Sequence, residues 1–320
     1  MRKPIPILLM LAVATWAVLA QTQASKPSEE EPIIKVDVDV VSLFCSVRDK
    51  RGAFVKDLDK ESFTVLEEGK QQEIRYFSRE TELPLTIGLL IDVSKSMENF
   101  IEIEKRAAMQ FFRRMLRSKD VAFLMSFGSE AELLQDFTNS PRLLQKGLDD
   151  LRLSVPVGGP MPSPTGAKQR GTIMYDAVYL AATEKLRREV GRKAIVLITD
   201  GVDHGSRVKL PEAVAQAHKS DTIIYSIYYS DPRYAFYGGG DGDLKRMSEE
   251  TGGRVYHVSG RRTLDIIFDE ISEEMRSQYA IGYTPSNPNK DGSFRRVDIR
   301  TTNKDHKILA RKGYYAEKTR

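Results

Sequence analysis

The chain has 320 residues with a nearly balanced charge, 49 lysines and arginines against 45 aspartates and glutamates. Because this balance gives no strongly charged surface, it supplies no argument for a nucleic-acid or acidic-membrane partner. The single cysteine, Cys45, excludes a disulfide within the chain, so stability must come from apolar cores, which a chain of this length can form. Cys45 lies in an alternating apolar run and is predicted to be buried.

The N-terminus has the pattern of an export signal. Residues 1–3 are basic, residues 5–19 are mostly apolar, and small residues favour cleavage near Ala20, with Ala24 as an alternative point. We therefore expect a secreted or periplasmic protein with a signal peptide over residues 1–20 and no membrane span after cleavage. An uncleaved N-terminal anchor is the alternative. Residues 21–32 are predicted to be a solvated linker.

Two segments that flank the middle of the chain alternate between apolar and polar residues, as half-buried strands do. They are residues 33–80 and residues 279–316. Neither segment has enough strands to close a core alone, so we predict one small antiparallel β-sandwich-like domain built from both. Residues 84–276 would then form a second domain, inserted between the two halves of the first.

Strands and helices alternate through this middle segment, which predicts an α/β fold with a doubly wound, mostly parallel sheet and helices on both faces. Buried strands are expected at 85–91, 120–127, 193–199, 222–228 and 254–258, with an antiparallel edge strand at 131–137. Helices are expected at 99–116, 141–151, 172–190, 211–220, 243–250 and 264–276.

The first of these helices has one apolar face, as expected of a helix that packs on a sheet. Glutamates and arginines are assigned to its other faces. The residues predicted to be on the apolar face are Phe100, Ile103, Ala107, Phe111 and Met115.

A cluster of oxygen-bearing side chains follows the strand expected at 85–91. This strand shows no alternation, which is typical of a strand buried on both faces at the centre of a parallel sheet. Asp92, Ser94 and Ser96 come directly after it and offer one carboxylate and two hydroxyls. Such hard donors suit Mg²⁺, Mn²⁺ or Ca²⁺. A turn or a helix N-cap is the alternative explanation of this Asp-Ser sequence.

Two later residues are expected near this cluster. Asp200 follows the strand at 193–199, so it should lie at the same edge of the sheet as Asp92. Thr172 is expected to open a helix, which would place its hydroxyl at the helix N-terminus. Each residue alone is ordinary, Thr172 as an N-cap and Asp200 as a turn residue. Their order along the chain is what points to a shared site.

The order Asp-x-Ser-x-Ser, then Thr, then Thr-Asp-Gly resembles the von Willebrand factor type A domain over about residues 84–276. In that family these positions build a metal-ion-dependent adhesion site. The resemblance implies that Ser94 and Ser96 bind the ion directly, often with Thr172, and that the two aspartates bind it directly or through water. The implied metal ligands are Asp92, Ser94, Ser96, Thr172 and Asp200.

The segments outside this domain resemble a secreted bacterial subgroup of the family, the VWFA-related acidobacterial proteins. Four stretches carry the similarity: residues 47–52, 58–70, 278–285 and 311–315. The similarity implies little about a ligand.

A divalent ion held mainly by neutral hydroxyls keeps much of its charge, so an acidic side chain from a partner can complete its coordination. We therefore expect an exported adhesion-type module that captures an Asp or Glu carboxylate of a protein partner, without catalysis. Mg²⁺ is the expected ion, with Mn²⁺ or Ca²⁺ as alternatives. Two other hypotheses are a metal-assisted hydrolase with Asp203 or His204 as its base, and a structural envelope component that uses no metal.

Two loops are expected to surround the site and to set its specificity. They are residues 155–171, rich in proline and glycine, and residues 230–242. The second loop carries aromatic and basic side chains that either form a contact patch or pack on the rim: Arg233, Tyr234, Phe236 and Tyr237.

Overall fold

The structure is a computed structural model. It describes residues 40–80, 83–154, 171–229 and 240–317. The signal peptide and linker expected at the N-terminus, and most of the two specificity loops, lie outside the described residues. Within the described residues, no helix is long and apolar enough to cross a membrane.

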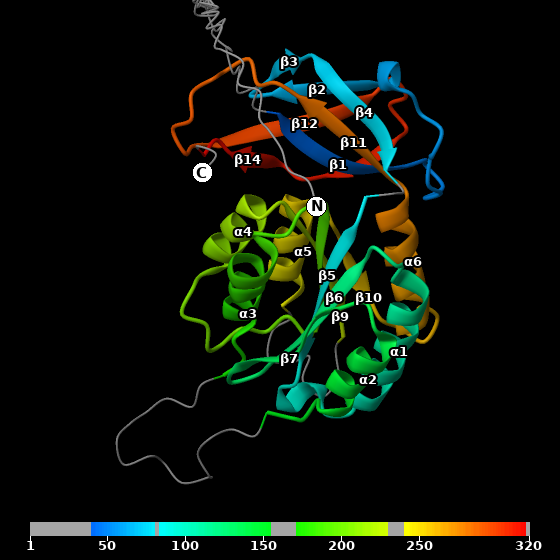
Figure 1. Ribbon diagram of the computed structural model, residues 1–320, viewed down its shortest axis with the longest axis vertical. Helices are drawn as coiled ribbons and strands as arrows, with labels where there is room; N and C mark the ends of the chain where they lie inside the picture. Colours follow the sequence, from blue (N-terminus) through cyan, green and yellow to red (C-terminus); the bar gives the residue numbers. More distant parts are fainter. Residues whose placement is uncertain (1–39, 81–82, 155–170, 230–239, 318–320) are drawn as a thin grey trace, which may run out of the picture. The chain divides into compact units, whose positions relative to one another are not determined.

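A six-stranded sheet in the order β10-β9-β8-β5-β6-β7 forms the centre of the α/β part (Figure 1). β5 pairs in parallel with β6 and β8, β9 and β10 extend the parallel sheet, and β7 is antiparallel to β6. The predicted central and edge strands are therefore confirmed. The strands are β5 (Leu85–Asp92), β6 (Val121–Phe127), β7 (Ala131–Thr138), β8 (Arg192–Thr199), β9 (Thr222–Tyr228) and β10 (Val255–His257).

Helices cover both faces of this sheet, which explains why every residue of β5 and β8 is buried (Figure 1). Helices α1, α2 and α6 pack on one face, and α3, α4 and α5 on the other. The doubly wound α/β fold is confirmed. The helices are α1 (Ile101–Met115), α2 (Pro141–Asp149), α3 (Met174–Leu180), α4 (Leu210–Lys219), α5 (Asp241–Thr251) and α6 (Leu264–Arg276).

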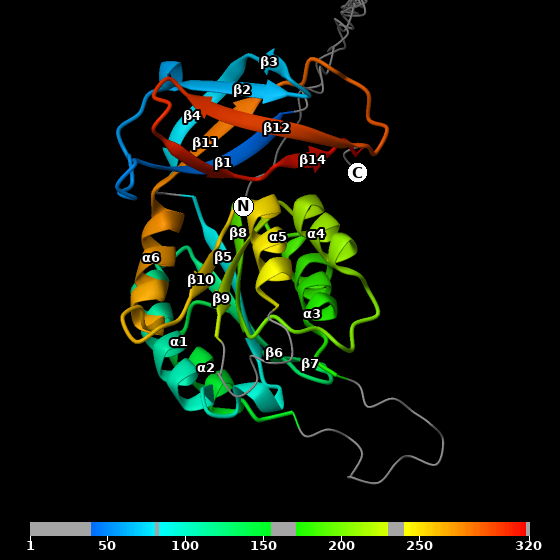
Figure 2. The same ribbon diagram turned by 180° about the vertical axis from the view of Figure 1, so that it is seen from behind.

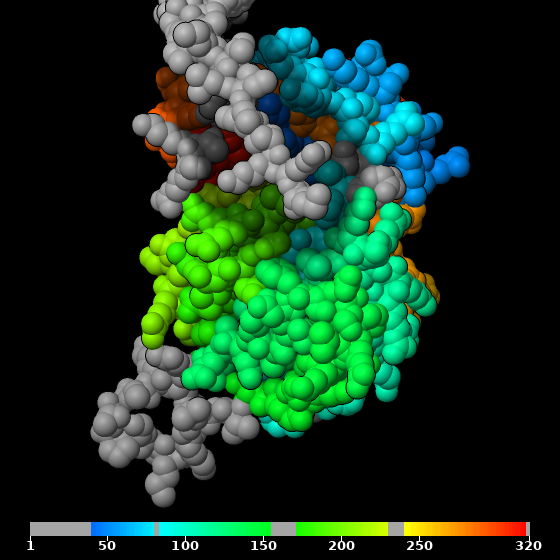
Figure 3. All heavy atoms as spheres, viewed as in Figure 1, coloured from blue at the N-terminus to red at the C-terminus, as the bar shows by residue number. Residues whose placement is uncertain are grey.

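The antiparallel edge strand of the sheet is less buried than the inner strands. β10 forms one edge (Figure 2), and β7 forms the other. The residues of β7 are exposed or half-buried, and the space-filling view of Figure 3 shows the side chains around β7 and α2, in green, at the surface. Side chains for the parallel core therefore come mainly from the four inner strands.

The buried face of α1 differs from the prediction at one position. Ile103 is 42% exposed, whereas Glu104 is fully buried. Helical residues advance by about 100° each, so the residue three positions after the buried Ile101 returns to the core and the residue two positions after it does not. The prediction that Ile103 lies on the apolar face is therefore wrong.

The chain segments on either side of the α/β part form two four-stranded antiparallel sheets, in the orders β13-β1-β11-β4 and β14-β12-β2-β3. Each sheet contains strands from both flanks, as in the pairing of β1 with β11 and of β2 with β12 (Figure 2). Cys45 is free and buried in the apolar cluster that the two sheets share, as predicted. The strands are β1 (Val41–Arg48), β2 (Phe63–Glu67), β3 (Lys70–Gln72), β4 (Ile74–Glu80), β11 (Gln278–Tyr283), β12 (Phe294–Thr301), β13 (Lys307–Ala310) and β14 (Gly313–Tyr315).

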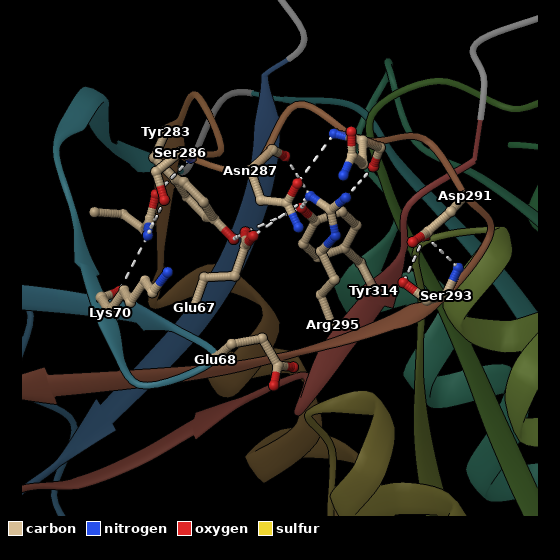
Figure 4. A network of polar contacts seen from close by, with 12 residues as sticks. Glu67, Glu68, Lys70, Tyr283, Ser286, Asn287, Asp291, Ser293, Arg295 and Tyr314 are labelled. Atoms are coloured by element: carbon tan, nitrogen blue, oxygen red, sulfur yellow. Dashed lines mark hydrogen bonds and ion pairs between the residues drawn. The ribbon is translucent and has the colours of Figure 1, made fainter.

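A buried acid in these sheets shows how the chain neutralises charge in its interior (Figure 4). Glu67 is 3% exposed and accepts hydrogen bonds from the hydroxyls of Tyr283 (2.7 Å) and Tyr314 (3.0 Å). Arg295 lies 3.5 Å from its carboxylate and also donates to the carbonyl of Asn287 at 2.6 Å. Because every charged group in this network has a partner, its burial is tolerated.

The tight packing of β5 gives a first prediction. A Cβ added to Gly88 would lie 2.3 Å from Cζ of Phe123 on the neighbouring strand β6. Gly88→Ala should therefore lower the free energy of unfolding by about 1–3 kcal/mol through overpacking. Unfolding in urea, followed by circular dichroism, measures the difference. Gly242→Ala is the matched control, because nothing lies within 4 Å of its added Cβ in helix α5. Equal midpoints for the two variants would contradict this account of the core.

Candidate metal centre

The carboxyl ends of β5 and β6 are joined to neighbouring loops by main-chain hydrogen bonds. The N–H of Val93 donates to the carbonyl of Phe127 (2.8 Å), and the N–H of Ser154 donates to that of Val93 (2.8 Å). The N–H of Ile173 donates to the carbonyl of Gly128 at 2.9 Å. The segment that follows β5 and the segment that carries Thr172 are thus fixed to the same strand end.

Asp92 is fully buried at the end of β5, and both of its carboxylate oxygens accept hydrogen bonds. Oδ1 accepts from the N–H of Ser94 at 2.9 Å, and Oδ2 accepts from the hydroxyl of Thr199 at 2.6 Å. Burial, followed by the negative charge of Asp200, raises the pKa of Asp92 to about 7, although these hydrogen bonds act in the opposite direction. The carboxylate is held in place, but its charge is only partly compensated.

The hydroxyls of Ser94 and Ser96 face each other, with their oxygens 3.1 Å apart. Ser94 precedes a 3₁₀ turn (Lys95–Met97) but forms no side-chain capping bond to it. The N-cap explanation therefore does not account for this hydroxyl. The bond from the Ser94 N–H to Asp92 is the turn interaction expected of an aspartate at this position.

Asp200 lies at the end of β8, the strand beside β5. Its Oδ1 accepts from the N–H of Val202 at 3.1 Å, and its charge acts on Asp92. Gly201 has φ of +77° and packs against the backbone of Gly240, so only glycine suits this turn. Asp200 and Asp92 are thus close at one edge of the sheet, as the sequence predicts from their strand ends.

Thr199 belongs to the site, although the sequence analysis assigned it only to a strand. Its hydroxyl donates to Asp92 and accepts from the N–H of Gly201 at 3.0 Å. A threonine directly before the second aspartate of the motif was the available signal. Its role is to connect the two strand ends.

Thr172 is not a helix N-cap. Helix α3 begins at Met174, and its N-cap is Ile173, which makes no side-chain capping bond. The carbonyl of Thr172 instead accepts from the N–H groups of His204 (3.1 Å) and Gly205 (3.0 Å). The main chain of Thr172 is thus held by the loop after β8, and within the described residues no hydrogen bond joins its hydroxyl to the cluster around Asp92. The prediction that it opens the helix is wrong.

The reason is that distant side chains satisfy the first N–H groups of α3. Asp203 accepts from the N–H of Tyr175 (3.0 Å), and the hydroxyl of Ser206 accepts from the N–H of Asp176 (3.0 Å). Asp176 in return accepts from the N–H of Arg207 at 2.9 Å. These reciprocal bonds dock the helix on the loop and replace a local cap.

Glu104 is a second residue that the sequence analysis missed. It is fully buried in the first turn of α1, and within the described residues neither of its carboxylate oxygens has a hydrogen-bond partner. Burial, followed by the charge of Asp92, raises its pKa well above the ordinary value. The available signal was its spacing, three residues after Ile101 on the buried stripe of α1.

This donor set fits a hard divalent cation, because it offers carboxylate and hydroxyl oxygens around an acid that lacks a counter-charge. In the part of the chain that the structure describes, no group of three or more His, Cys, Asp and Glu side chains is arranged to hold a metal. A site that relies on serine and threonine hydroxyls would not form such a group. The residues that could hold the ion are Asp92, Ser94, Ser96, Thr172 and Asp200.

The family model described as the von Willebrand factor type A domain matches residues 87–202. Residues 87–202, from β5 to the turn after β8, thus match this domain family. The acidobacterial subgroup suggested by the flanking segments of the chain stays a prediction. None of the curated proteins compared with the chain shows significant similarity to it.

Solved structures share the fold of this A domain at low sequence identity. Proximal thread matrix protein 1 from the mussel byssus aligns with a TM-score of 0.51 and 14% identity, over 66% of this chain and 51% of that one. A second structure of that protein has a zinc-occupied metal-ion-dependent adhesion site motif (TM-score 0.49, 14% identity, 66% and 50% coverage). The von Willebrand factor domain of a type V pili tip protein from Porphyromonas gingivalis aligns with a TM-score of 0.46 and 12% identity, over 60% and 95%. At such identities the likeness concerns the fold alone.

The raised pKa of Asp92 gives a second prediction, for the protein in EDTA. The folded state holds this proton up to about pH 7, whereas the unfolded chain releases it near pH 4. Between these values the unfolded state binds fewer protons, so stability should fall as pH rises from about 4 to about 7, by at most about 1.4 kcal/mol per pH unit for one group. Urea unfolding across this range measures the slope.

Asp92→Asn tests the assignment of this slope. The variant should have a shallower dependence on pH, and the remainder should include Glu104, whose pKa is shifted in the same direction. Identical slopes for the wild type and Asp92→Asn would show that Asp92 ionises normally in the folded protein.

Proposed function

We propose that this protein is an exported, metal-dependent protein-binding module whose A domain captures a carboxylate of a protein partner through a divalent ion. The observation that carries the proposal is the arrangement around Asp92 at the end of the central strand. Its carboxylate is buried and fixed on both oxygens, and the hydroxyls of Ser94 and Ser96 lie beside each other next to it.

The chain's own residues would fix the ion without neutralising it. Ser94 and Ser96 are neutral ligands, and the carboxylate of Asp92 already accepts hydrogen bonds from an N–H and a hydroxyl. A divalent ion, when bound, supplies an electrophilic position that favours an anionic oxygen ligand. An Asp or Glu side chain of a partner matches this position in charge and in donor type. Mg²⁺ and Mn²⁺ are the ions we expect.

A cleft of about 490 Å³ beside Thr172 offers a surface for the rest of such a partner. Ile173, Tyr179, Ser129 and Ala131 line it, and its charged residues are Arg207, Glu130 and Asp176. None of the five proposed ligands lines the cleft, but Ile173 directly follows Thr172 and its N–H donates to the carbonyl of Gly128, just beyond the end of β6, at 2.9 Å. Residues next to the partner's acidic side chain would lie in this cleft.

The structure gives no support to the hydrolase hypothesis. Asp203, one of the two candidate bases, accepts hydrogen bonds from the N–H of Tyr175 and from both the N–H and the hydroxyl of Ser206. These bonds commit its oxygens to holding helix α3. We therefore propose binding without catalysis.

Calorimetric titration with Mg²⁺ and Mn²⁺ tests the proposed site. Asp92→Ala should abolish binding, and Ser94→Ala should weaken it at least about tenfold, since each removes an oxygen donor. Asp120→Ala is the matched control, because Asp120 is a buried acid that binds the N–H of Leu85 at the other end of β5 (3.0 Å). It should cost stability but leave ion affinity unchanged. A wild-type protein that binds neither ion would overturn the proposal.

Capture of a partner is tested separately. The immobilised protein should retain a partner from an envelope extract in Mg²⁺, and EDTA should release it, because the ion forms the contact with the partner's carboxylate. Immobilised Asp92→Ala should retain none. Retention that is equal with EDTA, or equal for Asp92→Ala, would favour the structural hypothesis in which the A domain uses no metal.

A further inference from the structure

Glu104 occupies a position in the core where an apolar side chain would be expected. Its side chain is fully buried on α1, and in the described part of the chain neither carboxylate oxygen has a hydrogen-bond partner. A buried acid without a partner is costly, and leucine at this position would avoid that cost. The core therefore contains a side chain that lowers the stability of the fold, which points to a role other than packing.

A second buried acid on the same face of the sheet shows the usual solution. Glu274 on α6 is also fully buried, but it pairs with Arg48 at 2.9 Å and with Arg254 at 3.3 Å. No lysine or arginine in the described ranges forms such a pair with Glu104. The positive charge that would balance Glu104 is thus not supplied by the described side chains.

The surroundings of Glu104 connect it to the proposed ion site. It lies one helical turn after Phe100, whose ring is 3.8 Å from that of Tyr229, measured between centroids. The charge of Asp92 acts on Glu104, and the charge of Glu104 acts on Tyr229. The N–H of Tyr229 also donates to the carbonyl of Thr199 (3.0 Å), whose hydroxyl binds Asp92, so Glu104 lies on the side of the site covered by α1.

We propose that Glu104 is a positioning residue of the metal centre, which accepts hydrogen bonds from water bound to the ion held at Asp92, Ser94 and Ser96. This inference rests on the proposed function. Both oxygens of Asp92 already accept bonds from Ser94 and Thr199, so coordinated water needs another acceptor, and Glu104 has two free oxygens. Outer acceptors of this kind orient coordinated water and raise the affinity for the ion.

Titration with MnCl₂ and thermal unfolding in EDTA test this role together. Glu104→Gln keeps the shape of the side chain and removes its charge, so the affinity for Mn²⁺ should fall about 10- to 100-fold. The melting temperature in EDTA should stay the same or rise, because a buried acid without a partner is removed. Glu104→Asp keeps the charge at a shorter reach and should recover part of the affinity, and it decides the test if Glu104→Gln does not fold.

Glu274→Gln is the matched control, since it removes a buried charge that has arginine partners. It should lower the melting temperature in EDTA and leave the affinity for Mn²⁺ unchanged. If the wild type binds Mn²⁺ and Glu104→Gln binds it equally well, this inference is overturned and the proposed function stands. If the wild type does not bind Mn²⁺, both are overturned.

Discussion

The hydrogen bond from the Thr199 hydroxyl to Asp92 is the interaction on which the site depends, because it joins the ends of two parallel strands. β5 and β8 pair in a register that places Ile91 opposite Ile198, so Asp92 and Thr199 are the next residues along. A shift of one residue would turn Asp92 to the other face of the sheet. The burial of both strands on both faces fixes this register, and the apolar core thus determines the geometry of a polar site.

The sheet was predictable because its signal is local and continuous. The run at 85–91 has no charged residue and only one polar one, Thr86, and the fully buried β5 follows from it. The pattern of α1 was less informative at two positions. Counting apolar residues assigns Ile103 to the core and a glutamate to solvent, whereas the helix buries Glu104 and exposes Ile103. Hydrophobicity alone cannot predict a buried acid.

The site residues also differ in how well the sequence predicted their positions. Asp92 and Asp200 could be placed from the sequence because each follows a predicted parallel strand, and such ends meet at one edge. Thr172 could not, because the start of α3 is set by Asp203 and Ser206, about 30 residues further along the chain. A local rule for N-caps favours the nearest threonine, and it fails where the cap comes from another loop. Thr199 was missed for a related reason, since a strand-end hydroxyl acquires its role only when the neighbouring strand is known.

Buried acids elsewhere in the described chain have basic partners: Glu67 with Arg295, Glu274 with Arg48 and Asp120 with Arg276. At the carboxyl edge of the central sheet, by contrast, the acids have no basic partner among the described residues. Asp200 and Glu104 each lie within electrostatic range of Asp92 there, and no lysine or arginine in the described ranges forms an ion pair with any of the three. Like charges held together in a region of low dielectric destabilise the fold unless protons or a cation neutralise them, and the raised pKa values of Asp92 and Glu104 reflect this cost. This contrast with the paired acids supports the proposed site, because an ion bound there would remove the charge imbalance that weakens the metal-free fold.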